Sequence, residues 1–121
     1  MNKRILVIED TADNRQIMRD LLTNVGYEVF EAVDGLSGVA AVEATKPDLI
    51  LMDIQLPGID GYEATRRIKA NAAHAHIPII AVTSYALSGD EDKARAAGCN
   101  GYVTKPFSPR DLLARVRSFL T

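Results

Sequence analysis

Residues 49–61 read LILMDIQLPGIDG, and the class of the fold follows from this stretch. An apolar run, Leu49 to Met52, ends on the carboxylate of Asp53, and turn-forming residues follow at once. A short apolar run bounded by turn residues is typical of a strand that is buried on both faces. Such strands belong to parallel sheets covered by helices on both sides. The stretch therefore predicts an α/β fold, and it leaves open why a buried strand should end on an acid.

On both sides of this stretch, strand and helix patterns alternate, giving five strand–helix pairs along the chain. Apolar, β-branched runs predict strands, and apolar residues spaced three and four positions apart predict helices. The expected strands are 4–8, 27–32, 49–52, 78–82 and 101–103, and the expected helices are 13–25, 35–45, 61–70, 89–97 and 109–120. The alternation predicts a doubly wound α/β sandwich around a parallel sheet, with the weakly apolar strand 27–32 at an edge.

Three helix starts carry capping residues. Asp60, Ser88 and Ser108 each precede a predicted helix, and a side-chain oxygen at that position accepts a hydrogen bond from the first turn. Pro109, directly after Ser108, suits the first helical position. The helix that ends near residue 97 should be loosely held, because its apolar face consists only of Ala94, Ala96 and Ala97.

Length and composition exclude several classes of protein. A chain of 121 residues corresponds to one domain, and the last predicted helix ends at its final residues, so we expect a single domain over 1–121 without an output domain. The net charge is −2 and the 14 basic residues are scattered, which argues against nucleic-acid binding. No apolar stretch approaches the roughly 18 residues of a membrane span, and no signal peptide is present. The single Cys99 fits a reducing, cytoplasmic setting.

Polar side chains stand at the carboxyl ends of four predicted strands. In open parallel sheets these ends meet along one edge, and binding sites form there. The sequence therefore predicts one small pocket that holds three carboxylates, an ammonium group and hydroxyls, from Glu9-Asp10, Asp53, Thr83-Ser84 and Thr104-Lys105. A shared binding site at this edge would explain why the buried strand ends on Asp53. The simpler alternative is that Asp53 only caps the following turn.

The chemistry of this pocket favours a divalent cation. Three neighbouring acids repel one another, and Lys105 alone does not balance them. Oxygen ligands select Mg²⁺ over zinc, and the two histidines, His74 and His76, lie before the fourth strand. A Mg²⁺ ion with few protein ligands keeps positions open for phosphate oxygens. Carboxylates, Mg²⁺, a hydroxyl and a lysine are the parts that phosphoryl transfer to an aspartate needs.

In these motifs the chain resembles the receiver domain of two-component response regulators, the CheY-like family. The resemblance covers the whole chain and is carried by Glu9-Asp10, Asp53 in MDIQLPGIDG, Thr83 in AVTSYA, Tyr102 in GYVTKPF, and Lys105-Pro106. Within the family the chain is similar to stand-alone cell-cycle receivers of the DivK kind and to receivers attached to hybrid histidine kinases. The resemblance implies a flavodoxin-like (βα)5 fold with strand order 2-1-3-4-5.

The resemblance also implies roles for the acids. Asp53 would accept a phosphoryl group from a phosphohistidine on a histidine kinase or phosphotransfer protein. Mg²⁺ would be bound by Asp10, Asp53 and the backbone carbonyl of Gln55, with Glu9 contributing through water. The protein would then be a phosphoacceptor that signals to a downstream protein, with self-catalysed phosphorylation and dephosphorylation at most, and not a conventional enzyme.

The remaining motif residues would read out the phosphoryl group. Lys105 would contact it, Thr83 would form a hydrogen bond with it after transfer, and Tyr102 would rotate inward in response. The Lys105–Pro106 peptide bond would be cis, which X-Pro bonds permit at small cost. Ser84 stands where Ala is more usual in the family, and Gln55 and Tyr85 flank the route of attacking water.

Contact surfaces follow from the same expectation. The first helix, beside the acids, is expected to dock the phosphodonor. The signal is expected to leave through the face built from the helix at 90–97, the last strand and the last helix, because that face carries Tyr102 and the loosest helix.

Three other functions fit the sequence less well. An aspartyl phosphatase of the haloacid dehalogenase kind needs a second acid two residues after its nucleophile, and Gln55 occupies that position. A flavodoxin-like FMN carrier needs a phosphate-binding first loop, whereas residues 9–13 are rich in acids. A pseudo-receiver that binds partners without phosphorylation remains an alternative, although the set of acids, hydroxyl and lysine is complete.

Overall fold

Five parallel strands form one twisted sheet. The computed structural model describes residues 2–84 and 89–120. Its strands are β1 (Arg4–Ile8), β2 (Glu28–Ala32), β3 (Leu49–Asp53), β4 (Ile79–Thr83) and β5 (Gly101–Thr104). They lie in the order β2-β1-β3-β4-β5, which confirms the predicted flavodoxin-like topology and places β2 at an edge.

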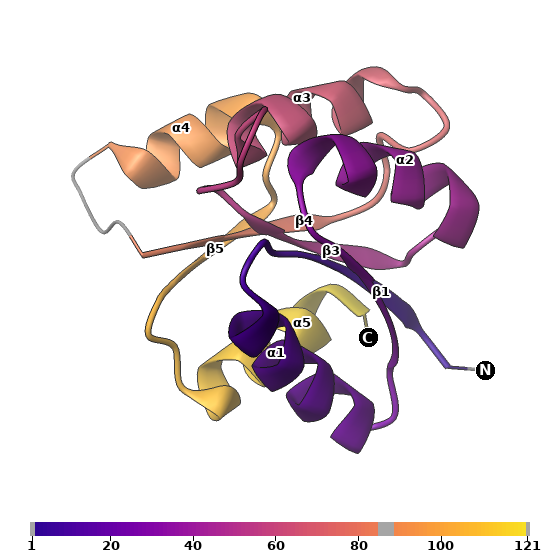
Figure 1. The fold of residues 1–121 in the computed structure, drawn as a ribbon, viewed down its shortest axis with the longest axis vertical. Helices are drawn as coiled ribbons and strands as arrows, with labels where there is room; N and C mark the ends of the chain where they lie inside the picture. Colours follow the sequence, from indigo (N-terminus) through magenta and orange to yellow (C-terminus); the bar gives the residue numbers. More distant parts are fainter. Residues whose placement is uncertain (1, 85–88, 121) are drawn as a thin grey trace.

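Helices cover both faces of this sheet (Figure 1). The helices are α1 (Ala12–Asn24), α2 (Gly35–Thr45), α3 (Gly61–Ala70), α4 (Asp90–Ala97) and α5 (Pro109–Leu120). Figure 1 shows α1 and α5 on one side of the sheet and α2, α3 and α4 on the other. Burial on both faces explains why β1, β3 and β4 are almost entirely apolar in sequence.

Two apolar clusters form the core, one on each side of the sheet. Under α1 and α5, the fully buried side chains of Met18, Leu22, Leu112 and Val116 pack against alternate residues of the central strands. The opposite cluster joins the other strand residues to α2, α3 and α4. The central strands of the sheet are therefore held from both sides, and their carboxyl ends lead into loops.

The strands continue one residue further than their apolar runs predict. Asp53, Thr83 and Thr104 are the last residues of β3, β4 and β5, and Thr83 is paired with Thr104 across the sheet. Because these polar residues belong to the strands themselves, the sheet holds their backbones in register. The candidate site therefore begins on rigid structure.

Helix caps agree with the predictions at two helices and differ at a third. Asp60 Oδ1 accepts a hydrogen bond from Glu63 N at 2.9 Å, and Ser108 Oγ accepts one from Asp111 N at 3.0 Å. Helix α4 begins at Asp90 with Gly89 as its N-cap, so the predicted cap at Ser88 is wrong by one position. Ser88 itself lies outside the described residues.

The apolar face of α4 is narrower than its composition indicates. Ala94 and Ala97, three positions apart, are buried, but Ala96 is exposed because it lies on the other side of the helix. The helix is thus anchored by two methyl groups.

Within the described part of the chain, none of the helices has both the length and the hydropathy that crossing a membrane would require.

Candidate functional site

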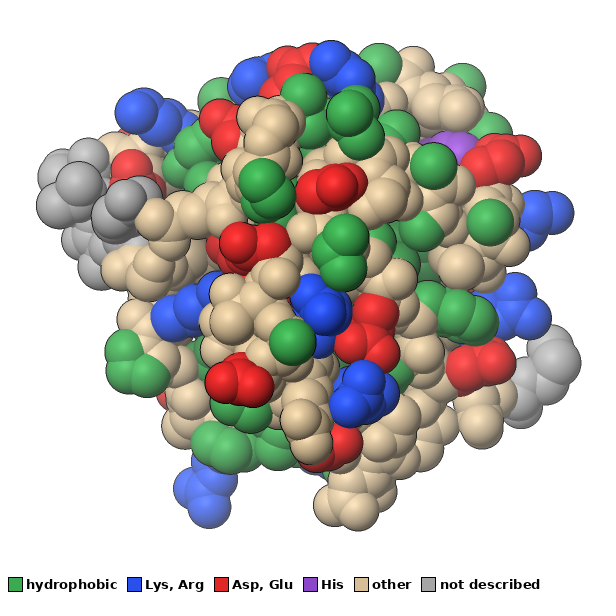
Figure 2. Space-filling view, in the orientation of Figure 1, with side chains coloured by type: hydrophobic (Ala, Val, Ile, Leu, Met, Phe, Trp, Pro, Cys, Tyr) green, Lys and Arg blue, Asp and Glu red, His purple; other side chains and the backbone are tan. Residues whose placement is uncertain are grey.

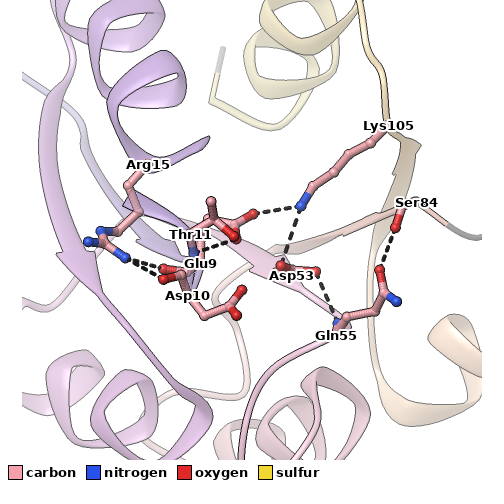
Figure 3. Close-up of polar contacts among 8 residues, drawn as sticks. All are labelled: Glu9, Asp10, Thr11, Arg15, Asp53, Gln55, Ser84 and Lys105. Carbon is pink, nitrogen blue, oxygen red and sulfur yellow. Dashed lines mark hydrogen bonds and ion pairs between the residues drawn. The ribbon is translucent and has the colours of Figure 1, made fainter. Parts of the chain in front are cut away.

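The carboxyl ends of β1, β3 and β5 bring two acids and a lysine into contact (Figure 3). Lys105 Nζ lies 2.6 Å from Glu9 Oε1 and 3.3 Å from Asp53 Oδ2. The side chains of Glu9 and Asp53 are 0% and 3% exposed, respectively. Residues that are far apart in sequence therefore form one buried ionic cluster at the edge where parallel strands end.

Glu9 is fixed by groups on both sides of its chain. Its Oε2 accepts a hydrogen bond from Thr11 N at 3.0 Å, and its own N–H donates to the Ala32 carbonyl of β2 at 3.0 Å. Burial alone would raise the pKa of Glu9, but the Lys105 ammonium and the Thr11 N–H outweigh it and hold that pKa below its usual value. Glu9 therefore stays ionised.

The surroundings of Asp53 disfavour its ionised form. Burial raises the pKa of Asp53 to about 6; the charge of Glu9 adds to the rise, while the Gln55 N–H and Lys105 oppose it. The Gln55 N–H donates to Asp53 Oδ1 at 3.0 Å. The carboxylate is consequently ionised at neutral pH, but it is held in a state that a nearby cation would stabilise.

Helix α3 starts directly against the backbone of this acid. A Cβ on Gly61 would lie 2.3 Å from the Asp53 carbonyl oxygen and 2.7 Å from Ile54 Cα, closer than non-bonded atoms approach. Only glycine permits this contact. The loop after β3 is thereby tied to the strand end, and the Gly61 N–H donates to the Ile54 carbonyl at 2.9 Å.

Asp10 completes a set of three carboxylates that could hold a metal ion. Oxygen atoms of Glu9, Asp10 and Asp53 all lie within 4.8 Å of one another. Asp10 is exposed, and Figure 3 shows its carboxylate to one side of the other two acids, farther from Lys105. A set of hard carboxylate oxygens without histidine or cysteine favours Mg²⁺ over zinc. The Gln55 backbone, in the loop after β3, lies at the same edge.

The two residues predicted to read out a phosphoryl group lie on neighbouring strands. Thr83 is buried at the end of β4, and its carbonyl accepts a hydrogen bond from Lys105 N at 2.6 Å. Tyr102 of β5 is half-buried and packs against the core cluster under α3 and α4. The Lys105–Pro106 bond is cis, as the resemblance implies. Thr83 thus stands at the carboxyl end of β4, and Tyr102 lies two residues before the end of β5.

Ser84 and Gln55 lie at the mouth of the pocket. The Ser84 hydroxyl donates to Gln55 Oε1, so the loops after β3 and β4 are linked by a side-chain hydrogen bond (Figure 3). Both residues are exposed. Tyr85, which the sequence places beside them, lies outside the described residues.

One residue near the acids was missed by sequence reasoning. The Arg15 guanidinium, one turn into α1, donates through Nη1 to the carbonyls of Glu9 and Asp10 at 2.8 and 3.0 Å. A basic residue one turn after an acid pair is the signal that could have identified it. His74, by contrast, lies away from the site and pairs with Glu43 at 2.9 Å.

Two grooves flank the site. One, of about 310 Å³, lies between α1 and the segment after β5 and is lined by Asn14, Ile17, Ser84 and residues 105–107. Ile17 is 51% exposed there. The other, of about 460 Å³, lies between α4, β5 and α5 and includes Tyr102. Figure 2 shows acidic and basic side chains interspersed over the viewed face, without a stripe of one sign.

Comparisons of sequence give a consistent result. The family model of the response regulator receiver domain matches residues 5–117. The polar-differentiation response regulators DivK of Brucella anthropi and Brucella ovis are each 40% identical to this chain over 120 residues, which covers 99% of this chain and 98% of theirs.

Solved structures agree with the sequence relatives. The receiver domain of a sensor histidine kinase from Pseudomonas aeruginosa, with a magnesium ion coordinated in its active-site cleft, has a TM-score of 0.91 and 38% identity, covering 99% of this chain and 98% of that one. A CheY-like receiver domain protein from Methanospirillum hungatei has a TM-score of 0.90 and 33% identity, covering 99% and 94%.

Proposed function

The chain belongs to the response regulator receiver domain family of two-component signalling systems, and on that premise we propose that it accepts a phosphoryl group on Asp53 with the help of Mg²⁺. The observation that carries the proposal is the placement of Asp53. Its carboxylate is buried at the end of β3, and it is in contact with Lys105 and close to Glu9 and Asp10. Bound Mg²⁺ would supply positive charge that neutralises the carboxylates and the phosphoryl oxygens.

The acids would divide the work of metal binding and attack. Asp10, Asp53 and the Gln55 backbone carbonyl would hold Mg²⁺, and Glu9 would assist through water. One Asp53 carboxylate oxygen would form a bond to phosphorus while the bond from phosphorus to the histidine nitrogen of the donor breaks. With a pKa of about 6 in the metal-free protein, Asp53 is mostly ionised at pH 7, so no base is needed to activate it.

Lys105 would stabilise the transferred group. Burial alone would lower the pKa of Lys105, but its hydrogen bond to Glu9 and its ion pair with Asp53 raise that pKa, so the group carries its charge throughout the physiological range. It already contacts the acceptor carboxylate at 3.3 Å. A phosphoryl group on Asp53 would therefore arrive within reach of a fixed cation.

Thr83 and Tyr102 would convert the new charge into a change of surface. A phosphoryl group brings a charge of about −2, which attracts hydroxyl donors. We propose that Thr83, at the end of β4, turns its hydroxyl toward this group and that Tyr102 on the neighbouring strand follows. The change then shifts the population of two existing conformations without refolding the domain.

The contact surfaces suggest how the signal enters and leaves. We propose that a histidine kinase or phosphotransfer protein docks over α1, where Ile17 is exposed beside the pocket. The groove between α4, β5 and α5 contains Tyr102 and would bind the downstream protein. The proposed setting is the cytoplasm, and the proposed output is a protein contact and not nucleic-acid binding.

Other functions in the family use the same site. The relatives include DivK response regulators and also the receiver domain of a sensor histidine kinase. Whether this chain acts as a response regulator or as a receiver of a kinase, Asp53 would be the acceptor. A pseudo-receiver that works without phosphorylation would not need the full set of acids, lysine and buried threonine that the structure brings together.

Labelling of the protein with a small phosphodonor tests the proposal. With Mg²⁺ present, we expect one acid-stable, base-labile phosphoryl group per chain, mapped to Asp53 by mass spectrometry. Asp53→Asn should abolish it, and EDTA should slow it strongly. Asp60→Asn, which changes an exposed acid that caps α3, is the matched control and should label normally. Undiminished labelling of the Asp53 variant, or an EDTA-insensitive rate, would contradict the proposal.

A further inference from the structure

Arg15 reaches back from α1 to the turn that carries the acid pair. Its Nη1 donates to the Glu9 carbonyl at 2.8 Å and to the Asp10 carbonyl at 3.0 Å (Figure 3). We propose that Arg15 is a positioning residue for the metal site, which sets the direction of the Asp10 carboxylate by holding the backbone on both sides of it. This inference rests on the Mg²⁺ site of the proposed function.

The two contacts stabilise an abrupt bend. In a regular strand, successive carbonyls point to opposite sides. Here the carbonyls of Glu9 and Asp10 face the same nitrogen atom, and the chain turns at Asp10 from β1 into α1. Without a donor at this place, two carbonyl groups would lose their partner and the bend would have no side-chain support.

Asp10 depends on its backbone more than the other two acids do. Glu9 is held by Lys105 and by the Thr11 N–H, and Asp53 by Lys105 and by the Gln55 N–H. Within residues 2–84 and 89–120, the Asp10 carboxylate forms no hydrogen bond or ion pair with another protein group. Its direction therefore follows from the turn that Arg15 supports.

Arg15 is itself held by the sheet. Its Nε lies 3.5 Å from Glu31 Oε1 of β2, and its side chain is only 18% exposed. Glu31 also pairs with Arg19, whose Nη1 lies 2.9 Å from Glu31 Oε2. A planar guanidinium can contact a carboxylate and carbonyls at once, which a lysine ammonium does less well. The contact thus runs from an edge strand through Arg15 to the acid pair.

Charge and positioning predict opposite effects of losing Arg15. By charge alone, removing a cation near the acids would tighten Mg²⁺ binding. The ion pair with Glu31 offsets part of that charge, so we expect loss of positioning to dominate. Groups that orient metal ligands typically contribute about 10- to 100-fold to metal affinity. The sign of the change therefore separates the two explanations.

The test compares Mg²⁺ affinity, measured by titration calorimetry, in the full chain and its variants. We expect Arg15→Gln to bind Mg²⁺ about tenfold more weakly than the parent. Arg15→Lys, which keeps the charge, should also bind more weakly. Arg19→Gln is the matched control: it loses a partner of the same Glu31, does not touch the carbonyls, and should bind within about twofold of the parent.

Spectra of the metal-free protein give a second readout. In Arg15→Gln the backbone amide NMR shifts of residues 9–11 should change, while those of β3 stay in place. Phosphodonor labelling should recover at saturating Mg²⁺, because the acceptor itself is intact. Mg²⁺ binding by Arg15→Gln at parental strength or tighter would overturn the inference. A parent that binds no Mg²⁺ would instead overturn the proposed function. If Arg15→Gln fails to fold, Arg15→Lys decides the question because it keeps the charge: weaker Mg²⁺ binding supports the inference, and binding at parental strength overturns it.

Discussion

At the scale of single residues, Asp53 illustrates how a site is built at the expense of stability. Its ionised form is disfavoured by burial and by Glu9, which raises its pKa from 3.8 to about 6. A rise of this size corresponds to about 3 kcal/mol. The unfolded chain releases this proton near pH 4 and the folded chain near pH 6, so this group lowers stability as the pH rises through that window. Glu9, with a lowered pKa, acts in the opposite direction.

Replacement of Asp53 by Asn should therefore stabilise the metal-free protein. Urea unfolding in EDTA should give Asp53→Asn a gain of up to about 3 kcal/mol at pH 8. The gain should almost vanish at about pH 3, which is below the pKa of the parent carboxyl in both the folded and the unfolded state. Asp10→Asn, at the exposed member of the cluster, serves as the control and should gain less. Equal stability of parent and Asp53→Asn at pH 8 would show that burial and Glu9 do not destabilise the ionised form of Asp53.

At the scale of elements, the site depends on how closely α3 approaches β3. Ordinary helix signals, Asp60 as a cap and apolar residues at helical spacing, explain why α3 forms. They do not explain its first residue, where Gly61 touches the backbone of Asp53 and Ile54. The position of Asp53 therefore depends on a contact that only the packed structure reveals.

A methyl group at Gly61 should disturb both the fold and the site. Because the atoms in the way are backbone atoms, Gly61→Ala should force the strand end to move, and we expect a loss of about 2 kcal/mol in unfolding free energy. Mg²⁺ affinity should fall with it. Gly58→Ala is the control: φ is +77° there, but a Cβ would meet no atom within 4 Å, so it should cost about 1 kcal/mol and leave Mg²⁺ binding unchanged. Normal Mg²⁺ binding by Gly61→Ala would show that the contact does not position Asp53.

At the scale of the whole molecule, rigidity is uneven across the sheet. The central strands are buried on both faces, whereas β5 has four residues at an edge and α4 buries only Ala94 and Ala97. Segments with few buried apolar contacts open at low free energy. The side of the molecule that carries Thr83 and Tyr102 is therefore the side best able to respond to a new charge in the pocket.

A non-hydrolysable phosphoryl mimic should reveal this asymmetry. With Mg²⁺ and the mimic bound, backbone amide NMR shifts should change at the pocket, in α4 and in β5, and remain nearly unchanged in α2 and β2. Thr83→Ala should keep the changes at the pocket and lose those at Tyr102. Changes limited to the pocket in the parent would contradict transmission through β4 and β5.

The sequence alone determined the architecture and the identity of the acids. Period and composition are sufficient for this because parallel strands must bring their carboxyl ends to one edge, so polar residues after apolar runs meet whatever the details of packing. Asp53, Glu9 and Lys105 are in contact for this reason. The family resemblance supplied their expected roles, which composition and spacing do not contain.

The contacts between elements became visible in the packed structure and could not be read from the sequence. Three contacts join segments whose distance depends on packing and loop geometry. They are the hydrogen bonds from Arg15 to two carbonyls, the close approach of Gly61 to Asp53, and the hydrogen bond from Ser84 to Gln55. The outward turn of Ala96 likewise follows from how α4 lies on the sheet. Local patterns specify which face of an element is apolar, but the rotation and depth at which two faces meet are set by close packing of the whole core.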